Sequence, residues 1–328
     1  MPIPGIPIQP FPICFGAASF GSILPLEASF ELLDAYAEAG GNFLDTAHIY
    51  CVWLPGGAGA SERAIGAWMS SRANRHAIIV GTKGGHPPLD NMARGRCSQR
   101  DLEQDLSESL ERLATNYVDL YWLHRDDVSL PVEKIVDTLA GFVRDGRARA
   151  LGVSNWTIER IARANAYAAA NNLPPIVANQ PDWSLAEWPA GQPLVGDMKY
   201  ADDAMLRWHA ATGIVMAPYS SQAHGYFGAE NALWAEAGFC GVPPRGAEYD
   251  TPINRRRLTS AIAIARRRQC APSQVALAFL MSQPFLVYPI IGTHQIAHLK
   301  EALGATHVRL TDQEVRDLRE AEAPHTTQ

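Results

Sequence analysis

Four side chains of the sequence, Asp45, Tyr50, Lys83 and His124, have the chemistry to deliver a proton together. A phenol ionises at about pH 10 in water, so a lone Tyr is a poor proton donor or acceptor at neutral pH. A nearby ammonium group favours the phenolate and lowers that pKa, and a carboxylate holds the ammonium charged and in place. An imidazole beside them can bind and orient a carbonyl oxygen. The set therefore predicts acid–base chemistry at a carbonyl group that accepts a hydride.

Taken one at a time, these residues have ordinary structural interpretations. Asp45 can begin a turn with Thr46, and Lys83 can lie on the surface beyond a strand. Tyr50 can simply pack, and His124 can be a hydrogen-bonded polar residue at a strand end. The functional interpretation is favoured only if the fold brings all four residues to one rim.

Short apolar runs alternate with amphipathic stretches along the chain, which predicts strands that alternate with helices. The runs fit strands buried on both faces, and they cover residues 13–17, 43–45, 77–82, 118–124, 148–154, 176–180, 214–220 and 286–292. Helices are expected at 27–39 and from Ser98, Pro131, Thr157 and Pro272 onward.

Eight strands that alternate with helices pair in parallel through right-handed crossovers. Their number and the chain length favour an α/β fold of the closed (β/α)8 TIM-barrel type. We expect one domain over residues 1–328, with extra C-terminal helices and long loops on the C-terminal face. An open doubly wound sheet is the rival, and it usually carries a GxGxxG motif after its first strand. Residues 16–21, GAASFG, do not match that motif.

In such a barrel the chemistry lies where strands end on the C-terminal face. Polar residues end almost every predicted strand, namely Asp45, Lys83, His124, Ser154 with Asn155, Gln180, and Tyr219 with Ser220. This pattern predicts one site that many strands build together.

Composition excludes several other classes of protein. The chain has 28 Lys and Arg against 34 Asp and Glu, a net charge of −6, which argues against binding to nucleic acid or to an anionic membrane. No apolar run reaches the roughly 18 residues of a spanning helix, and the N-terminus lacks the pattern of a signal peptide. Five scattered Cys without a CxxC pair argue against disulfides or structural zinc, so we expect a cytoplasmic protein without a metal.

The sequence resembles the aldo-keto reductase family. The matching stretches follow the family order over nearly the whole chain: GGNFLDTAHIY (40–50), ASERAIGAW (60–68), IIVGTKGG (78–85), YVDLYWLHR (117–125), GVSNW (152–156), NQPDWSL (179–185), APYSSQAHG (217–225) and YPIIGTHQIAHLKEALGA (288–305). The resemblance implies a reductase that uses NADP(H) on a (β/α)8 barrel without a metal. It assigns Tyr50 as general acid/base, Lys83 and Asp45 as its partners, and His124 as the group that orients the carbonyl.

The resemblance also implies a cofactor groove. Its expected members are Gly16, Ala17, Asp45, Ser154, Asn155, Gln180, Tyr219, Ser220, Gln222, Gly225, Gly292, Thr293, His294, His298 and Glu301. Ser154, Asn155 and Gln180 suit a carboxamide, which both donates and accepts hydrogen bonds. Tyr219 resembles the residue that stacks on the nicotinamide ring. The family usually places Lys or Arg around positions 294–298 for the 2′-phosphate, and this chain has none there. NADP(H) is the family default, and NAD(H) becomes plausible.

The expected substrate contacts are Tyr50, Trp53, His86, His124, Trp156 and Trp183. Aromatic faces beside carboxylates and imidazoles suit a polyol, so a small-molecule sugar, keto-sugar or glycoside is the leading expectation for the carbonyl substrate. The same aromatic side chains also suit an aromatic carbonyl, and Trp156 and Trp183 have packing under loops as their structural alternative.

Two other functions compete with carbonyl reduction. The first is a nicotinamide-binding, redox-sensing regulatory module without significant turnover. The second is a metal-dependent barrel hydrolase that uses Asp45, His48, His86 and His124, but no paired-His spacing supports it. The complete set of Asp45, Tyr50, Lys83 and His124 favours catalysis.

Overall fold

The computed structural model describes residues 2–189 and 198–320, and an eight-stranded parallel sheet forms its centre. The strands are β1 (Cys14–Gly16), β2 (Phe43–Asp45), β3 (Ile79–Gly84), β4 (Val118–Leu123), β5 (Ala148–Ser154), β6 (Ile176–Gln180), β7 (Val215–Met216) and β8 (Ile290–Ile291). They lie in the order β7-β6-β5-β4-β3-β2-β1-β8, so strands that follow one another in the chain are neighbours in the sheet.

Backbone hydrogen bonds join the two ends of the sheet into a barrel. Met216 N donates to Leu286 O at 2.9 Å, and Tyr288 N donates to Met216 O at 2.8 Å. Met216 also forms a parallel bridge with Val287. These contacts confirm the predicted parallel barrel.

The last two strands are shorter than the sequence predicts. Strands at 214–220 and 286–292 were expected, whereas β7 and β8 contain two residues each. Pro218 and Pro289 interrupt these segments, and a Pro has no N–H to donate to a ladder. The seam therefore depends on single hydrogen bonds such as the one from Ile290 N to Pro218 O.

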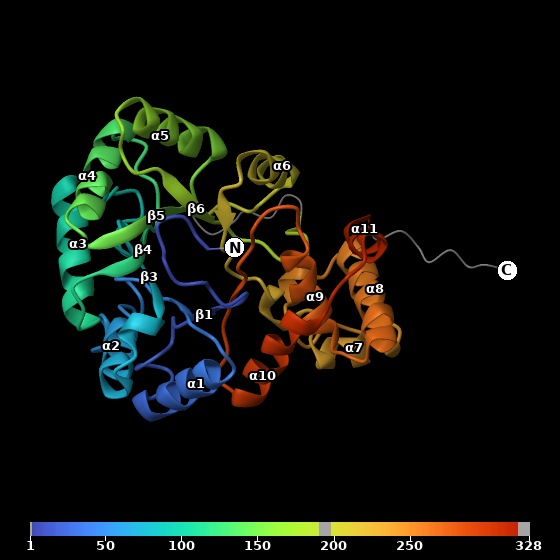
Figure 1. Ribbon diagram of the computed structural model, residues 1–328. Coiled ribbons are helices and arrows are strands. Elements are labelled where there is room, and N and C mark those ends of the chain that lie inside the picture. Colours follow the sequence, from blue (N-terminus) through green and yellow to red (C-terminus); the bar gives the residue numbers. More distant parts are fainter. Residues whose placement is uncertain (1, 190–197, 321–328) are drawn as a thin grey trace.

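Six helices cover the strands on the outside: α1 (Leu26–Glu38), α2 (Ala60–Arg72), α3 (Gln99–Arg112), α4 (Val132–Arg144), α5 (Ile158–Ala170) and α6 (Asp203–Thr212). Three more lie between β7 and β8, namely α7 (Ala229–Glu236), α8 (Pro252–Arg268) and α9 (Pro272–Met281), and α10 (Ile296–Gly304) and α11 (Asp312–Glu320) follow. Figure 1 shows α7 to α11 gathered on one side of the barrel.

Local signals explain several of the helix boundaries. Ser98 caps α3 as predicted, because its hydroxyl accepts the Asp101 N–H at 3.2 Å. Helix α4 begins directly after Pro131, and Pro272 occupies the first turn of α9. Among the residues that the structure describes, no helix is long and apolar enough to span a membrane.

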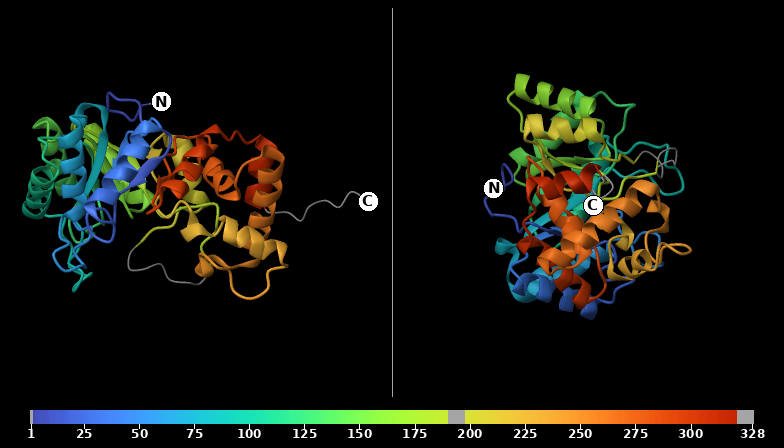
Figure 2. Two further views of the ribbon diagram at one scale, coloured as in Figure 1. Left: turned by 90° about the horizontal axis from the view of Figure 1, so that it is seen from below. Right: turned by 90° about the vertical axis from the view of Figure 1, so that its right-hand side faces the viewer.

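Apolar side chains fill the barrel interior. Trp122 of β4 is fully buried there beside Phe43 and Ile79. Ile3 and Ile6 belong to the same cluster, so the N-terminal segment closes one end of the barrel. Figure 2 shows this blue segment on the side opposite to the light-blue and teal loops that follow β2 and β3. Those loops mark the other end, where the polar strand ends lie.

Candidate active site

The ammonium group of Lys83 is the centre of a buried polar cluster at the C-terminal end of the barrel. Lys83 lies in β3, and its Nζ donates to Asp45 Oδ2 at 2.5 Å and to the hydroxyl oxygen of Tyr50 at 2.8 Å. Its third proton goes to the backbone carbonyl of Thr46 at 2.8 Å. All three donors of the ammonium group are therefore used, which fixes its position.

The charged pair lies deeper than the phenol. Lys83 and Asp45 are 1% and 2% exposed, whereas Tyr50 is half-buried. Burial alone would lower the pKa of Lys83, but Asp45 and Tyr50 raise it above its ordinary value. The amine is therefore a stable cation beside the phenol.

The pKa of Tyr50 is raised from its ordinary value. Burial raises it, Lys83 opposes the rise by favouring the phenolate, and Asp45 adds to it. The expectation of a lowered pKa is correct for the contribution of Lys83 and wrong for the net direction. The phenol is consequently protonated at neutral pH and holds a proton that it can give.

His124 directly follows β4 and brings an imidazole to the same end of the barrel. Its ring lies 5.9 Å from the Tyr50 ring and 4.7 Å from the His86 ring, both edge to face. Burial, together with the charge of Lys83, holds the pKa of His124 well below its ordinary value. The imidazole is therefore neutral, and it can donate a hydrogen bond without adding a second cation.

A chain of short polar side chains continues from Asp45 across the barrel mouth. Gln180 donates to Asp45 Oδ1 at 3.0 Å, and the Ser154 hydroxyl donates to Gln180 O at 2.7 Å. Asn155 donates to Ser154 Oγ at 3.0 Å and accepts from the Tyr219 hydroxyl at 2.8 Å. The structure thus brings the predicted carboxamide ligands and the predicted stacking residue together beside the four catalytic candidates.

The loops after β1 and β8 form a second group. His294 Nε2 lies 2.7 Å from Ser19 Oγ, which joins the turn after Gly292 and Thr293 to the loop after Gly16 and Ala17. A Cβ atom added to Gly292 would meet nothing within 4 Å, so this turn lies open.

Other predicted cofactor residues lie in the loop after β7 and on α10. Gly225 has a φ of 86°, and Ser220 has a φ of 54°. Gln222 lies between them, next to the buried Ala223. On α10, His298 is exposed, whereas the Glu301 carboxylate accepts from Ser273 Oγ of α9 at 2.5 Å.

The three Trp residues predicted to contact substrate have different environments. Trp53 is 50% exposed on the loop after Tyr50. Trp156 has no exposed surface, and Trp183 packs in the core with its ring 6.2 Å from that of Phe279. The burial of both rings favours the alternative of packing under loops, and their contact with substrate stays a prediction.

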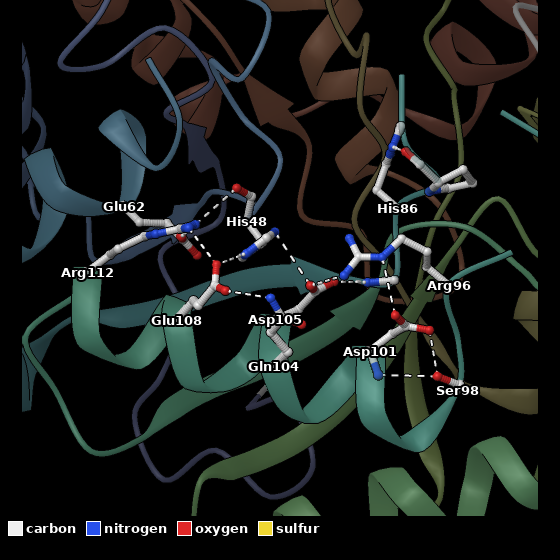
Figure 3. A network of polar contacts seen from close by, with 12 residues as sticks. His48, Glu62, His86, Arg96, Ser98, Asp101, Gln104, Asp105, Glu108 and Arg112 are labelled. Atoms are coloured by element: carbon white, nitrogen blue, oxygen red, sulfur yellow. Dashed lines mark hydrogen bonds and ion pairs between the residues drawn. The ribbon is translucent and has the colours of Figure 1, made fainter. Parts of the chain in front are cut away.

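The structure also shows polar neighbours of the candidate site that the sequence did not single out. Asp182 is buried beside Tyr219, and burial raises the pKa of its carboxyl to about 6. Helix α3 carries Asp105 and Glu108 toward His48, in a network of ion pairs and hydrogen bonds that Figure 3 shows. Asp182 was signalled only as an acid within the matched stretch NQPDWSL, and the α3 network had no local signal.

The structure holds no group of three or more His, Cys, Asp or Glu arranged to bind a metal ion within residues 2–189 and 198–320. All five Cys are free thiols.

Comparisons with known proteins agree with this geometry. The model of the Aldo/keto reductase family matches residues 12–323. A norsolorinic acid reductase of Aspergillus flavus is 28% identical, over 95% of this chain and 77% of its own length. An aryl-alcohol dehydrogenase of Pestalotiopsis microspora is 26% identical, over 96% of this chain and 79% of its own length. The solved structure of a thermostable aldo-keto reductase with the inhibitor epalrestat has a similar fold, with a TM-score of 0.71 at 22% identity over 95% of each chain.

Proposed function

Because the chain belongs to the aldo/keto reductase family, we propose that Tyr50 is the proton donor with which it reduces an aldehyde or ketone. The protein is an NAD(P)H-dependent oxidoreductase that interconverts carbonyl and alcohol groups. The observation that carries the assignment of Tyr50 is the 2.8 Å contact between its hydroxyl and the Lys83 ammonium group.

Each catalytic side chain has one task. Tyr50 gives its proton to the carbonyl oxygen, and the adjacent Lys83 cation stabilises the phenolate that remains. Asp45 holds Lys83 charged through the 2.5 Å ion pair. His124, which is neutral, donates a hydrogen bond to the carbonyl oxygen and orients it for the transfer. In the oxidative direction, Tyr50 takes the proton back.

The cofactor supplies the hydride when it is bound, and the polar mouth of the barrel fits it. Ser154, Asn155 and Gln180 offer both donors and acceptors, which is what a carboxamide requires. Tyr219 offers an aromatic face to the nicotinamide. The pyrophosphate and adenosine ligands that we propose are Gly16, Ala17, Ser220, Gln222, Gly225, Gly292, Thr293, His294, His298 and Glu301.

Discrimination between NADPH and NADH is expected to be weak. A 2′-phosphate is usually held by Arg or Lys, and positions 292–298 contain neither. His294 is engaged with Ser19, and Glu301 is engaged with Ser273. NADP(H) is the cofactor that we propose first, with NAD(H) as a working alternative.

The five free thiols support the cytoplasm as the location.

Exposed apolar side chains around the mouth indicate the substrate class. They lie on the loops that follow β2, β3 and β4, and they are Val52, Trp53, Leu89, Met92 and Val128. The loops after β2 and β3 project on the same side of the barrel (Figure 2). These loops begin at the strand ends that carry Asp45, Lys83 and His124, and apolar surface beside a polar site is typical of a ligand-binding site.

We propose an aromatic aldehyde or ketone as the preferred substrate, ahead of a sugar. An apolar rim stabilises an aryl group, whereas the hydroxyls of a polyol need free polar partners. Nearby Asp126 already pairs with Arg160 at 3.1 Å, and Asp127 accepts from Ser129. The similarity to an aryl-alcohol dehydrogenase supports the same class.

The variant Tyr50→Phe tests the proton donor. It removes the hydroxyl and keeps the ring, so we expect kcat for an aromatic aldehyde to fall by about 10²- to 10⁴-fold. The Kd of NADPH, measured by fluorescence titration, should stay within about twofold, because that hydroxyl is not among the proposed cofactor ligands. Unchanged kcat in Tyr50→Phe would remove this residue from its role.

The substrate class is tested by a comparison of kcat/KM for aromatic aldehydes and aldoses. We expect aromatic aldehydes to be preferred, and Trp53→Ala to lower their kcat/KM by about three- to tenfold through the loss of an aromatic contact. Leu233→Ala, which truncates an exposed apolar side chain of α7, is the matched control. A preference for aldoses that Trp53→Ala leaves unchanged would reject the aromatic class.

A further inference from the structure

The segment that carries Tyr50 is held by His48, two residues earlier in the chain. The backbone N–H of His48 donates to Lys83 O at 2.9 Å. Its imidazole, 15% exposed, faces α3, where Nε2 lies 2.8 Å from Glu108 Oε2 and Nδ1 lies 3.7 Å from Asp105 Oδ1. A carboxylate oxygen accepts, so His48 Nε2 carries a proton and donates it to Glu108.

The two carboxylates that face His48 are themselves held in place. Arg112, one helical turn after Glu108, pairs with the same carboxylate oxygen at 2.7 Å and donates to the backbone carbonyl of His48 at 3.3 Å. Arg96 pairs with Asp105 at 2.6 Å. Figure 3 shows these side chains converging from α3 and its flanking loops on the His48 ring. The His48 imidazole therefore contacts carboxylates whose positions are fixed by Arg112 and Arg96.

The same helix also holds the segment that follows Lys83. Asp105 Oδ2 accepts the backbone N–H of Gly85 at 2.9 Å, two residues beyond Lys83. Helix α3 thus contacts both segments whose side chains meet at the 2.8 Å contact between Lys83 Nζ and the Tyr50 hydroxyl. A shift of either segment relative to α3 would change that contact.

From this juxtaposition we propose that His48 is a positioning residue, which sets the Tyr50 hydroxyl against Lys83 through its hydrogen bond to Glu108. The inference rests on the proposed function of Tyr50. His48 acts through Tyr50, since its imidazole binds the carboxylates of α3 and is turned to the helix. The reaction needs the hydroxyl in one place, and displacements of about 1 Å can cost on the order of 100-fold in rate.

Three substitutions of His48 separate its contact with Glu108 from its contact with Asp105. His48→Ala removes both contacts. His48→Gln keeps an amide N–H near the place of Nε2, and His48→Asn keeps an amide N–H near the place of Nδ1. We expect His48→Ala to lower kcat by about 10- to 100-fold, with KM and the Kd of NADPH within about twofold. His48→Gln should recover kcat to within about threefold of the natural protein, and His48→Asn should not.

A second readout reports on the chemical step. With cofactor deuterated at the transferred position, His48→Ala should show a larger primary isotope effect, because a misplaced acid slows the chemistry and leaves product release unchanged. Glu108→Gln should repeat the kcat loss of His48→Ala in a milder form. Circular dichroism and thermal unfolding of each variant establish that it is folded.

The controls distinguish the inference from its premise. Glu103→Gln removes another α3 carboxylate, which pairs with Arg147 at 2.6 Å away from the site, and it should keep kcat. If Tyr50→Phe keeps full activity, the proposed function fails. If Tyr50→Phe is inactive and His48→Ala keeps its kcat, or if His48→Gln loses as much as His48→Ala, the positioning role is overturned.

Discussion

The exposure of the four catalytic candidates suits their tasks. Tyr50 and His124 are half-buried and reach the mouth of the barrel, whereas Asp45 and Lys83 are buried beneath them. An ammonium group and a carboxylate removed from water are costly unless they pair closely, and these two lie 2.5 Å apart. A buried pair is also little screened by salt, so its influence on the phenol is nearly independent of ionic strength.

Another buried residue makes stability depend on pH. His209 of α6 donates from Nδ1 to Ile214 O at 2.7 Å, and its Nε2 lies 3.2 Å from the amide nitrogen of Asn179. Burial lowers the pKa of His209 to about 4. Between about pH 6.5 and this value, the unfolded chain binds a proton that the folded chain excludes. The contribution of His209 to stability is therefore complete above about pH 6.5 and decreases as the pH falls.

Denaturant unfolding at two pH values measures this effect. When the pH is lowered from about 7 to about 5, His209 should decrease the free energy of unfolding by about 2 kcal/mol. His209→Gln has no group that titrates in this range, so its decline should be smaller by that amount. An equal decrease of the free energy of unfolding in both proteins would contradict the conclusion that folded His209 excludes a proton.

Among the elements, strands β3, β4 and β5 pack around one large side chain. Trp122 of β4 is fully buried, and its indole lies against Gly81 of β3 and Gly152 of β5. A Cβ atom at Gly152 would lie 2.2 Å from Trp122 Cε3, and one at Gly81 would lie 2.8 Å from Nε1. These two positions have room for Gly alone while the indole fills the barrel.

Gly152→Ala should therefore destabilise the protein. Overpacking of a rigid core typically costs about 1–3 kcal/mol, and the adjacent indole cannot move into solvent. Gly141→Ala is the matched control, because Gly141 lies inside α4 and a Cβ there would meet nothing within 4 Å. It should stabilise the protein by about 0.5–1 kcal/mol through helix propensity. Similar free energies of unfolding for both variants would contradict the packing account.

The molecule as a whole shares one core between the barrel and its C-terminal helices. The cluster that contains Trp68 of α2 and Leu106 of α3 also contains Leu258 of α8 and Leu318 of α11. The single domain over residues 1–328 stays a prediction. The barrel seam consists of two-residue strands, and Met216 of β7 and Ile291 of β8 belong to the same cluster.

The barrel and the convergence of the candidate catalytic residues were predictable because both follow from short-range patterns. Strand ends are marked by a change from apolar to polar residues, and a parallel barrel brings such ends together, as for Asp45, Lys83 and His124. No comparable sequence pattern indicates how deeply a side chain is buried. The net direction of the Tyr50 pKa was therefore not predictable from the sequence, and for Trp156 the sequence left packing and substrate contact as alternatives.

The His48 network escaped prediction for a related reason. Glu108 lies 60 residues from His48 in the chain, and both are polar residues that ordinarily face solvent. Only the approach of α3 to the loop after β2 brings them together. The short β7 and β8 had a visible signal in Pro218 and Pro289, which the apolar runs around them outweighed.

The anchoring of Tyr50 has a consequence for how this enzyme can be redesigned. The phenol of Tyr50, our proposed proton donor, is held from the β3 and α3 side, and the next residue, Cys51, is held by a hydrogen bond from its thiol to Ala18 O at 3.1 Å. Residues 52–58 follow these anchors. Gly59, the next residue, lies against the side chain of Arg112. Combinatorial libraries confined to the exposed Val52, Trp53 and Pro55 would vary which molecules are accepted and would leave the anchors of Tyr50 in place.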